Sequence, residues 1–136
     1  MNLKRLVYLS RLEAKLTTKD IYQIIETSEK NNEANGLSGL LVYSKRSFLQ
    51  VIEGDIYKLN GTFAKICRDP RHSDISIVEF TSIENRLFAN WTMKLFCLDD
   101  FEMPENMLER AESSPYYPFP IDADLFLEIL LWTKHR

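Results

Sequence analysis

Hydrophobic and polar positions along the chain switch between a period of two and a helical period. Residues 5–10 alternate, which predicts a strand with Tyr8 and Val7 on opposite faces. A helical spacing starts near Lys19, after a threonine pair suited to an N-cap. It ends at Asn35-Gly36, where glycine suits a left-handed C-cap. The first elements are therefore a strand followed by an amphipathic helix.

The same patterns predict a hairpin, a second helix and two more strands over residues 37–43 and 48–53, 54–69, 75–83 and 91–98. The order is β-α-β-β-α-β-β, which is the ferredoxin-like pattern with one added strand. We therefore predict an α+β fold in which both helices cover one face of the sheet.

The residues after the last predicted strand supply a cover for the other face, where Val7, Leu9, Leu49 and Val51 would otherwise be exposed. Two further helices are predicted at 103–112 and 122–135. From Leu125 to Trp132 the second of these helices is apolar nearly all round, so it is buried in its own fold or against a partner. We expect a domain at 1–98 and a C-terminal helical extension at 99–136, with the helical pair docked on the sheet or used in a homo-oligomer.

Composition and charge exclude several classes of protein. The 136 residues are 45% hydrophobic and 27% charged, with a net charge of −3 and no clustered basic residues. This indicates a packed domain without an electrostatic footprint for nucleic acid. No apolar run is long enough to span a bilayer, so no membrane partner is expected. Two cysteines form no disulfide framework or metal-ligand spacing, so we expect a cytoplasmic protein without a metal.

Polar side chains occupy positions where the pattern predicts apolar ones. Asn31 and Asn32 continue the buried stripe of the first helix, and Gln50 shares a strand face with Phe48. A buried amide without partners costs about 1–3 kcal/mol. Each residue taken alone has a plainer explanation, as a helix cap, a backbone-bonded amide or, for Tyr8, a core tyrosine. Together they suggest a polar ligand between helix and sheet.

Several motifs resemble the BLUF family (sensors of blue light using flavin), in particular its short cyanobacterial-type members. The matching stretches keep the family's order and spacing: RLVYLS at 5–10, NN at 31–32 with NGLSGLL at 35–41, FLQVIEG at 48–54, RDPRH at 68–72 and FANWTM at 88–93. The resemblance covers about residues 1–98 and weakens after them. It implies a blue-light photoreceptor, not an enzyme, that binds oxidised flavin non-covalently.

The resemblance also implies a role for each matching residue. Tyr8 corresponds to the electron and proton donor, and Gln50 to the amide whose hydrogen bonds rearrange to give a red-shifted signalling state. Trp91 and Met93 correspond to the pair linked to signalling. Alternation along a strand at 91–98 would place both on the face towards Gln50. Beside Tyr8 and Gln50, the residues expected to bind the cofactor are Ile24, Ile25 and Phe48 around the ring, Asn31 and Asn32 at its polar edge, and Lys65, Asp69 and His72 near the ribityl chain and phosphate.

The expected cofactor is FAD, with FMN or riboflavin as alternatives, because Lys65 stands where the family commonly has arginine and lacks its bidentate fork. No effector enzyme is evident in the sequence, so the signal is expected to reach a separate partner protein whose identity the sequence does not give. Two alternatives remain open at this point. One is a ligand-sensing module without flavin, and the other is an acylphosphatase-like hydrolase, although residues 10–15 lack the glycine of a phosphate-binding loop.

Overall fold

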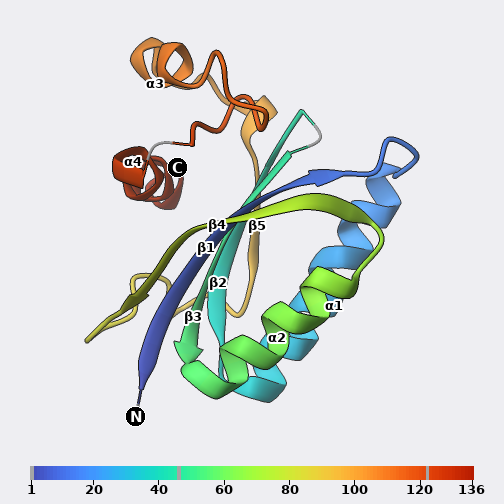
Figure 1. Cartoon of the computed structure of the whole chain (residues 1–136), viewed down its shortest axis with the longest axis vertical. Helices are drawn as coiled ribbons and strands as arrows, with labels where there is room; N and C mark the ends of the chain where they lie inside the picture. The colour runs from blue at the N-terminus through green and yellow to red at the C-terminus, as the bar shows by residue number, and fades with distance from the viewer. Residues whose placement is uncertain (1, 46, 122) are drawn as a thin grey trace.

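A computed structural model describes residues 2–45, 47–121 and 123–136, without the side chains of residues 123–125. Over these residues the chain forms one five-stranded sheet in the order β4-β1-β3-β2-β5 (Figure 1). The elements in chain order are β1 (Leu3–Leu12), α1 (Thr18–Asn35), β2 (Ser38–Ser44), β3 (Ser47–Asp55), α2 (Ile56–Arg68), β4 (His72–Ser82), β5 (Lys94–Cys97), a 3-10 turn (Leu98–Asp100), α3 (Glu105–Arg110) and α4 (Ala123–Lys134).

The sheet has the predicted α+β, ferredoxin-like topology. Strand β1 lies between β3 and β4 and is antiparallel to both, and β2 is antiparallel to β3. The added strand β5 runs parallel to β2 at the edge of the sheet. Helices α1 and α2 cover one face, while α3 and α4 lie on the other, as the ribbon shows (Figure 1). The predicted fold class is confirmed.

Capping residues fix where the two sheet-covering helices start and end. Thr17 caps α1 by accepting from the backbone N–H of Asp20, and the Asp20 side chain accepts in return from the Thr17 N–H. Gly36 ends α1 with a φ of 65°, a left-handed conformation that favours glycine. Asp55 caps α2 by accepting from the N–H groups of Tyr57 and Lys58. These contacts set the register of both helices over the sheet.

The sheet face opposite α1 and α2 is closed by the C-terminal residues. Val7, Leu9, Leu49 and Val51 are fully buried there, in one cluster with side chains from the tail: Met103, Met107, Tyr116, Phe119, Phe126, Ile129 and Leu130. The prediction of a C-terminal helical pair on this face is confirmed, although α3 is shorter than expected. Asp122 and the Leu125 side chain, both part of the predicted second helix, lie outside the described residues.

The predicted strand at 91–98 is wrong over its first part, because β5 begins only at Lys94. The residues before it form a turn, in which the Trp91 N–H bonds to the Phe88 carbonyl at 3.1 Å. The Trp91 carbonyl in turn accepts from the N–H of Gly39 on β2 at 2.9 Å. Without strand geometry, the alternation that was expected to place Trp91 and Met93 on one face does not apply.

Gly39 is a point of close approach within the sheet. A Cβ atom at this position would lie 2.2 Å from the Val51 carbonyl oxygen and 3.3 Å from the Met93 Cε. A backbone oxygen cannot yield that much space, so a side chain at position 39 is excluded without moving β3. The missing side chain lets Met93 lie against the sheet.

Of the helices in the described part of the chain, none combines the length and apolar character needed to cross a membrane.

Candidate functional site

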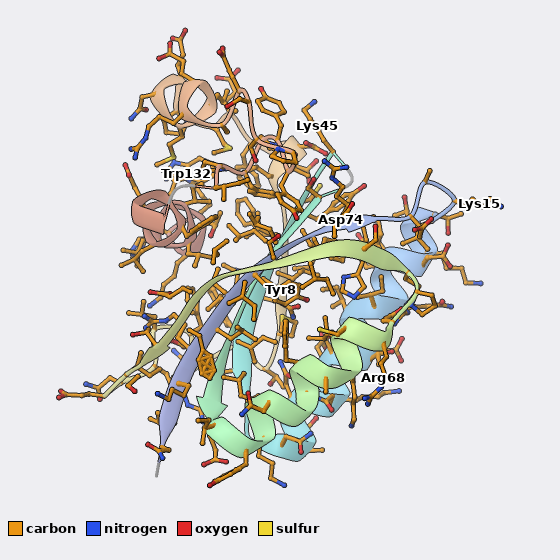
Figure 2. The ribbon with its side chains drawn as sticks, in the orientation of Figure 1. Tyr8, Lys15, Lys45, Arg68, Asp74 and Trp132 are labelled. Carbon is orange, nitrogen blue, oxygen red and sulfur yellow. The ribbon has the colours of Figure 1, made fainter. Side chains whose placement is uncertain are left out.

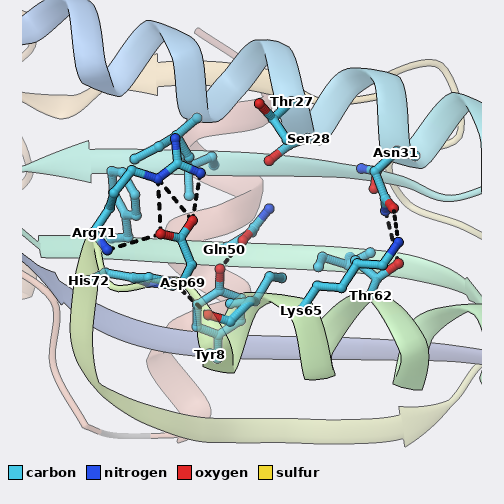
Figure 3. Close-up of a pocket in the computed structure, with 16 residues that line it drawn as sticks. Tyr8, Thr27, Ser28, Asn31, Gln50, Thr62, Lys65, Asp69, Arg71 and His72 are labelled. Atoms are coloured by element: carbon cyan, nitrogen blue, oxygen red, sulfur yellow. Dashed lines mark hydrogen bonds and ion pairs between the residues drawn. The ribbon is translucent and has the colours of Figure 1, made fainter.

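A cavity of about 210 Å³ lies between the sheet and the two helices α1 and α2. Its walls include apolar side chains from α1, α2 and two strands, and polar side chains gather at its floor and edges (Figure 3). The lining residues are Tyr8, Ile24, Thr27, Ser28, Asn31, Asn32, Leu41, Phe48, Gln50, Ile52, Thr62, Lys65, Ile66, Asp69, Arg71 and His72.

A phenol and a carboxamide form the floor of the cavity. Tyr8 and Gln50 are opposite each other in the β1–β3 ladder, and the Tyr8 hydroxyl donates a hydrogen bond to Gln50 Oε1. The Gln50 amide nitrogen points the other way and lies 3.7 Å from the Met93 sulfur. Only 2% of Tyr8 and 4% of Gln50 is exposed. Both ends of the Gln50 amide therefore have a defined partner.

Burial keeps the Tyr8 phenol protonated. Removal from water raises the pKa of Tyr8 well above its usual range, and the nearby Cys67 and Asp69 raise it further. The neutral phenol is consequently the only form present at rest. Its proton lies in the hydrogen bond to the Gln50 oxygen.

Two adjacent asparagines on α1 make separate contacts at the edge of the cavity. Asn31 Nδ2 donates to Thr62 Oγ1 on α2 at 2.9 Å, which joins the two helices across the cavity. Asn32, 1% exposed, donates to the Thr92 carbonyl at 2.7 Å and so joins α1 to the turn before β5. Asn31 Oδ1 already accepts from Asn35 Nδ2 at 3.2 Å and from Lys65 Nζ at 3.5 Å, so Asn31 keeps mainly donor capacity for a ligand.

An ion pair lies at the rim of the cavity, where α2 leads into β4. Arg71 contacts Asp69 through Nε at 2.9 and 3.0 Å and through Nη2 at 2.6 Å, as the dashed lines show (Figure 3). Burial alone would raise the pKa of Asp69, but the hydrogen bonds and charge of Arg71 outweigh it and hold the pKa below its usual range. The Arg71 guanidinium is thus committed to a neighbour, whereas the exposed Lys65 makes a longer contact, from Nζ to Asn31 Oδ1 at 3.5 Å.

His72 has a defined tautomer in its neutral form. Its Nε2 lies 2.9 Å from the Ile66 carbonyl, which can only accept, so Nε2 carries the proton. Nδ1, 3.1 Å from Ser10 Oγ, then accepts from that hydroxyl. Burial lowers the pKa of His72 below its usual value, against the opposing effects of the Ile66 bond and Asp69. The ring is therefore mostly neutral around pH 7.

The structure brings together nearly all of the residues that the sequence predicted for cofactor binding. Those that line the cavity are Tyr8, Ile24, Asn31, Asn32, Phe48, Gln50, Lys65, Asp69 and His72. Ile25 does not line it: the side chain is buried in a neighbouring cluster with Met93. One step along a helix rotates a side chain by about 100°, which places Ile25 on another side of α1 from Ile24.

The two residues of the expected signalling pair pack in different hydrophobic clusters. Met93 is buried on the helix side and reaches Gln50. Trp91 packs against the cluster on the other face, with its ring centroid 5.9 Å from that of Phe88. The turn before β5 therefore presents Met93, and not Trp91, to the cavity floor.

Further lining residues were missed by the sequence analysis, namely Thr27, Ser28, Leu41, Ile52, Thr62, Ile66 and Arg71. A signal for some of them exists, because Thr27 and Ser28 follow Ile24 and precede Asn31 at spacings of three and four. Such spacing places them on one face of α1. Leu41 and Ile52, in contrast, look like ordinary core residues in the sequence.

The cavity suits the ring system of a flat, amphipathic ligand with a longer polar tail. Its volume is below the roughly 300–1,000 Å³ typical for pockets that enclose a whole drug-sized molecule. Ile24 and Ile66 supply apolar surface, and the asparagines supply donors and acceptors at one edge. The exposed Lys65 lies where a tail would reach solvent. The residues present therefore fit a flavin, and among the described residues no His, Cys, Asp and Glu cluster could hold a metal.

The ferredoxin-like sheet and the cavity above the buried Tyr8–Gln50 pair agree with what the family resemblance predicts. The family model described as "Sensors of blue-light using FAD" (BLUF) matches residues 3–94. The chain belongs to the BLUF family. This assignment favours the sensor over the two alternatives left open by the sequence.

Curated relatives carry the same kind of domain within much longer chains. Photoactivated adenylate cyclase subunit beta of Euglena longa is 35% identical over 95 residues, which cover 68% of this chain and 11% of the relative. Subunit alpha of Euglena gracilis is 35% identical over 94 residues, covering 68% of this chain and 9% of the relative. The chain thus spans about a tenth of the length of these relatives.

Solved structures show the same fold. BlrB, a BLUF protein in its dark state, superposes with a TM-score of 0.71 at 27% identity, covering 99% of this chain and 93% of BlrB. A bacterial light-regulated adenylyl cyclase gives a TM-score of 0.72 at 28% identity, covering 98% of this chain and 35% of the cyclase. Both alignments extend through the C-terminal helices of this chain as well as its sheet.

Proposed function

We propose that this chain is a photoreceptor that holds FAD non-covalently in the cavity and senses light through Tyr8 and Gln50. When bound, the flavin supplies blue-light absorption and an excited state that accepts an electron. The observation that carries the proposal is the buried hydrogen bond from the Tyr8 hydroxyl to Gln50 Oε1 on the cavity floor. The remaining steps are performed by this chain's own residues.

Tyr8 is suited to donate an electron and a proton together. Its raised pKa keeps the proton on the phenol at rest. Loss of an electron makes a phenol strongly acidic, so its proton then moves along the existing hydrogen bond towards Gln50. Return of the electron and proton restores the phenol, and no bond is permanently changed.

Gln50 is suited to change its hydrogen bonds after Tyr8 has lost its proton, because its amide has an acceptor at one end and a two-proton donor at the other. In the resting arrangement the oxygen accepts from Tyr8 and the nitrogen lies 3.7 Å from the Met93 sulfur, a weak acceptor. Turning the amide exchanges these two ends. Little hydrogen-bond energy is lost at the sulfur, whereas the Tyr8 hydroxyl loses its acceptor and faces the amide nitrogen, from which its oxygen can accept instead.

Cofactor binding is proposed to use three sets of contacts. Ile24, Phe48 and Ile66 enclose the ring, and the free capacity of Asn31 and Asn32 meets its polar edge. Because Arg71 is already paired with Asp69, Lys65 is the side chain proposed to meet phosphate. FAD is proposed over FMN or riboflavin on the family's description.

We propose that residues 1–98 sense light and that residues 99–136 deliver the output to a separate partner protein, without enzymatic activity of this chain. A homo-oligomer is also part of the proposal, with the exposed apolar side chains Ile121 and Leu127 on the tail in contact with a second copy. The free cysteines Cys67 and Cys97 support a cytoplasmic location, where thiols stay reduced.

The decisive experiment is an absorption spectrum of the purified protein in the dark and under blue light. We expect a yellow protein whose visible band shifts slightly to the red and returns in darkness. Tyr8→Phe and Gln50→Leu should each retain flavin and lose the shift. Tyr22→Phe, at an exposed tyrosine on α1, is the matched control and should shift normally. A normal shift in Tyr8→Phe would contradict the proposed role of the phenol.

A further inference from the structure

The turn between β4 and β5 is held from two sides at one peptide group. Glu53, fully buried on β3, accepts hydrogen bonds from the N–H of Leu87 at 3.1 Å and from the N–H of Phe88 at 2.8 Å. Lys134, in the last turn of α4, donates from Nζ to the Leu87 carbonyl at 2.6 Å. The Leu87 carbonyl and the Phe88 N–H belong to the same peptide group. That group consequently joins β3 to α4.

This contact is stiff. A peptide group is planar, so its N–H and C=O ends move together. Both of its bonds involve a charged partner, a carboxylate on one side and an ammonium on the other, and such bonds are roughly twice as strong as neutral ones. Each bond also polarises the peptide in the sense that strengthens the other. Arg5, opposite Glu53 in the ladder, balances the buried carboxylate through Nε at 2.9 Å.

The same turn reaches the cavity floor. Met93, at its far end, lies 3.7 Å from the Gln50 amide nitrogen. Trp91, between the two ends, bonds through its N–H to the Phe88 carbonyl, and its ring lies beside the Phe88 ring. A change at Gln50 therefore meets a short, internally bonded segment whose other end is the bridging peptide group.

We propose that the Leu87–Phe88 peptide group, held between Glu53 and Lys134, is the joint through which Gln50 acts on α4. Glu53 and Lys134 are positioning residues of this joint, which rests on the proposed function. When the Gln50 amide turns, its oxygen replaces the nitrogen beside the Met93 sulfur, which has no proton to donate, so Met93 moves away and the segment from Phe88 to Met93 shifts with it. The bond between the Leu87 carbonyl and Lys134 then lengthens, and the last turn of α4 loosens.

The rest of α4 stays docked without this bond. Phe126, Ile129 and Leu130 are almost fully buried against the tail side of the sheet, and Thr133 bonds to the Leu130 carbonyl within the helix. Removal of the Lys134 ammonium should therefore break the contact with the Leu87 carbonyl and leave α4 docked on the sheet. The role of the joint can therefore be tested in the intact protein.

The test is hydrogen–deuterium exchange of the α4 amides in the full flavin-loaded chain, in darkness and under blue light. The parent protein should exchange faster in the last turns of α4 under light. Lys134→Met should keep the visible red shift but lose this light-dependent difference, and Lys134→Arg should restore it. Arg136→Met is the matched control: Arg136 is also a cation at the end of α4, but it lies 4.6 Å from the Trp132 ring of its own helix. It should keep the difference.

A second variant tests the opposite side of the joint. Glu53→Gln retains the shape of the side chain and removes its charge, so it should also reduce the light-dependent exchange difference. Because both residues act on one peptide group, the double variant should lose no more than Lys134→Met alone.

The outcomes separate the joint from the proposed function. A normal red shift together with a full exchange difference in Lys134→Met would overturn the joint and leave the photoreceptor proposal intact. Additive losses from Glu53→Gln and Lys134→Met would likewise overturn it. A parent protein without a spectral shift would overturn the proposed function, and the joint with it.

Discussion

The two faces of the sheet differ in packing: one carries a closed apolar cluster and the other a cavity. On the tail side, alternate residues of β1 and β3 such as Val7, Leu9 and Val51 are fully buried in a continuous apolar cluster. On the side of α1 and α2, the intervening positions include Tyr8 and Gln50, and a cavity remains beneath the helices. Figure 2 shows Trp132 on the tail side and Arg68 on the far side of α2. One pair of strands thus presents a closed core to one layer and a ligand site to the other.

Stability and function are therefore divided between the two faces of the sheet. In a close-packed interior, removal of side-chain volume lowers the free energy of unfolding. The cavity side already contains space and polar groups, so a substitution there changes packing less. Substitutions on the tail side should therefore act mainly on the free energy of unfolding. Substitutions on the helix side should act mainly on flavin binding and photochemistry.

Loss of a buried ring on the tail side should lower the stability of the fold more than any other change considered. Phe119→Ala removes a fully buried ring from the apolar cluster and should lower the free energy of unfolding by about 3–5 kcal/mol. Urea denaturation of the flavin-free protein measures this change. A cost below about 1 kcal/mol would show that the tail packs loosely and would remove the contrast between the faces.

A smaller effect is expected at the edge of the cavity. Asn32→Ala leaves the Thr92 carbonyl without its partner and should cost about 1–3 kcal/mol, with weaker flavin retention. Asn31→Ala, at the half-buried neighbour, should cost about 0.5–1.5 kcal/mol and also weaken flavin retention. Unfolding curves and flavin release on dilution measure the two effects. Equal flavin retention in both variants and the parent would argue against an amide-lined binding edge.

The smallest effect concerns pH. Burial depresses the pKa of His72, so the folded protein binds fewer protons there than the unfolded chain. The stability from this residue is fully present above the unfolded pKa of about 6.5. It is lost as the pH falls from there towards the lower folded pKa. Unfolding curves at about pH 7.5 and 5.5 should show the loss, and His72→Gln should reduce it. If the variant keeps the same pH dependence, the loss of stability at low pH comes from other titratable groups.

The sequence predicted those parts of the fold that depend on local pattern. Period-two and helical spacings identified the ferredoxin-like order, and the threonine pair at 17–18 and Gly36 marked the ends of α1 because caps are local chemistry. The strand predicted from Trp91 was wrong, since the turn before β5 is held by distant groups, Gly39 and Glu53. Long-range backbone bonds leave no periodic signal in the segment that they fix.

The residues of the candidate site also fall into two groups, those that the sequence makes visible and those that it does not. Tyr8, Gln50 and the two asparagines stood out because polar residues at apolar positions are visible in one sequence, and the family motifs gave them roles. Ile52 and Leu41 did not stand out, because a cavity wall and a core wall use the same apolar residues. Ile25 lies outside the cavity lining because adjacent helical residues differ by about 100°, and only the packing of α1 decides which one faces the cavity.

Gly39 carries a consequence for anyone who redesigns this sensor. The position has no room for even one methyl group, because the Val51 carbonyl and the Met93 side chain already occupy that space. Gly39→Ala would therefore displace β3 from β2 at this point, and a loss of light response in that variant would report the displacement and not a role in light detection. Tuning of the photocycle is better attempted by reshaping the thioether at position 93, which offers three rotatable bonds next to an immovable backbone.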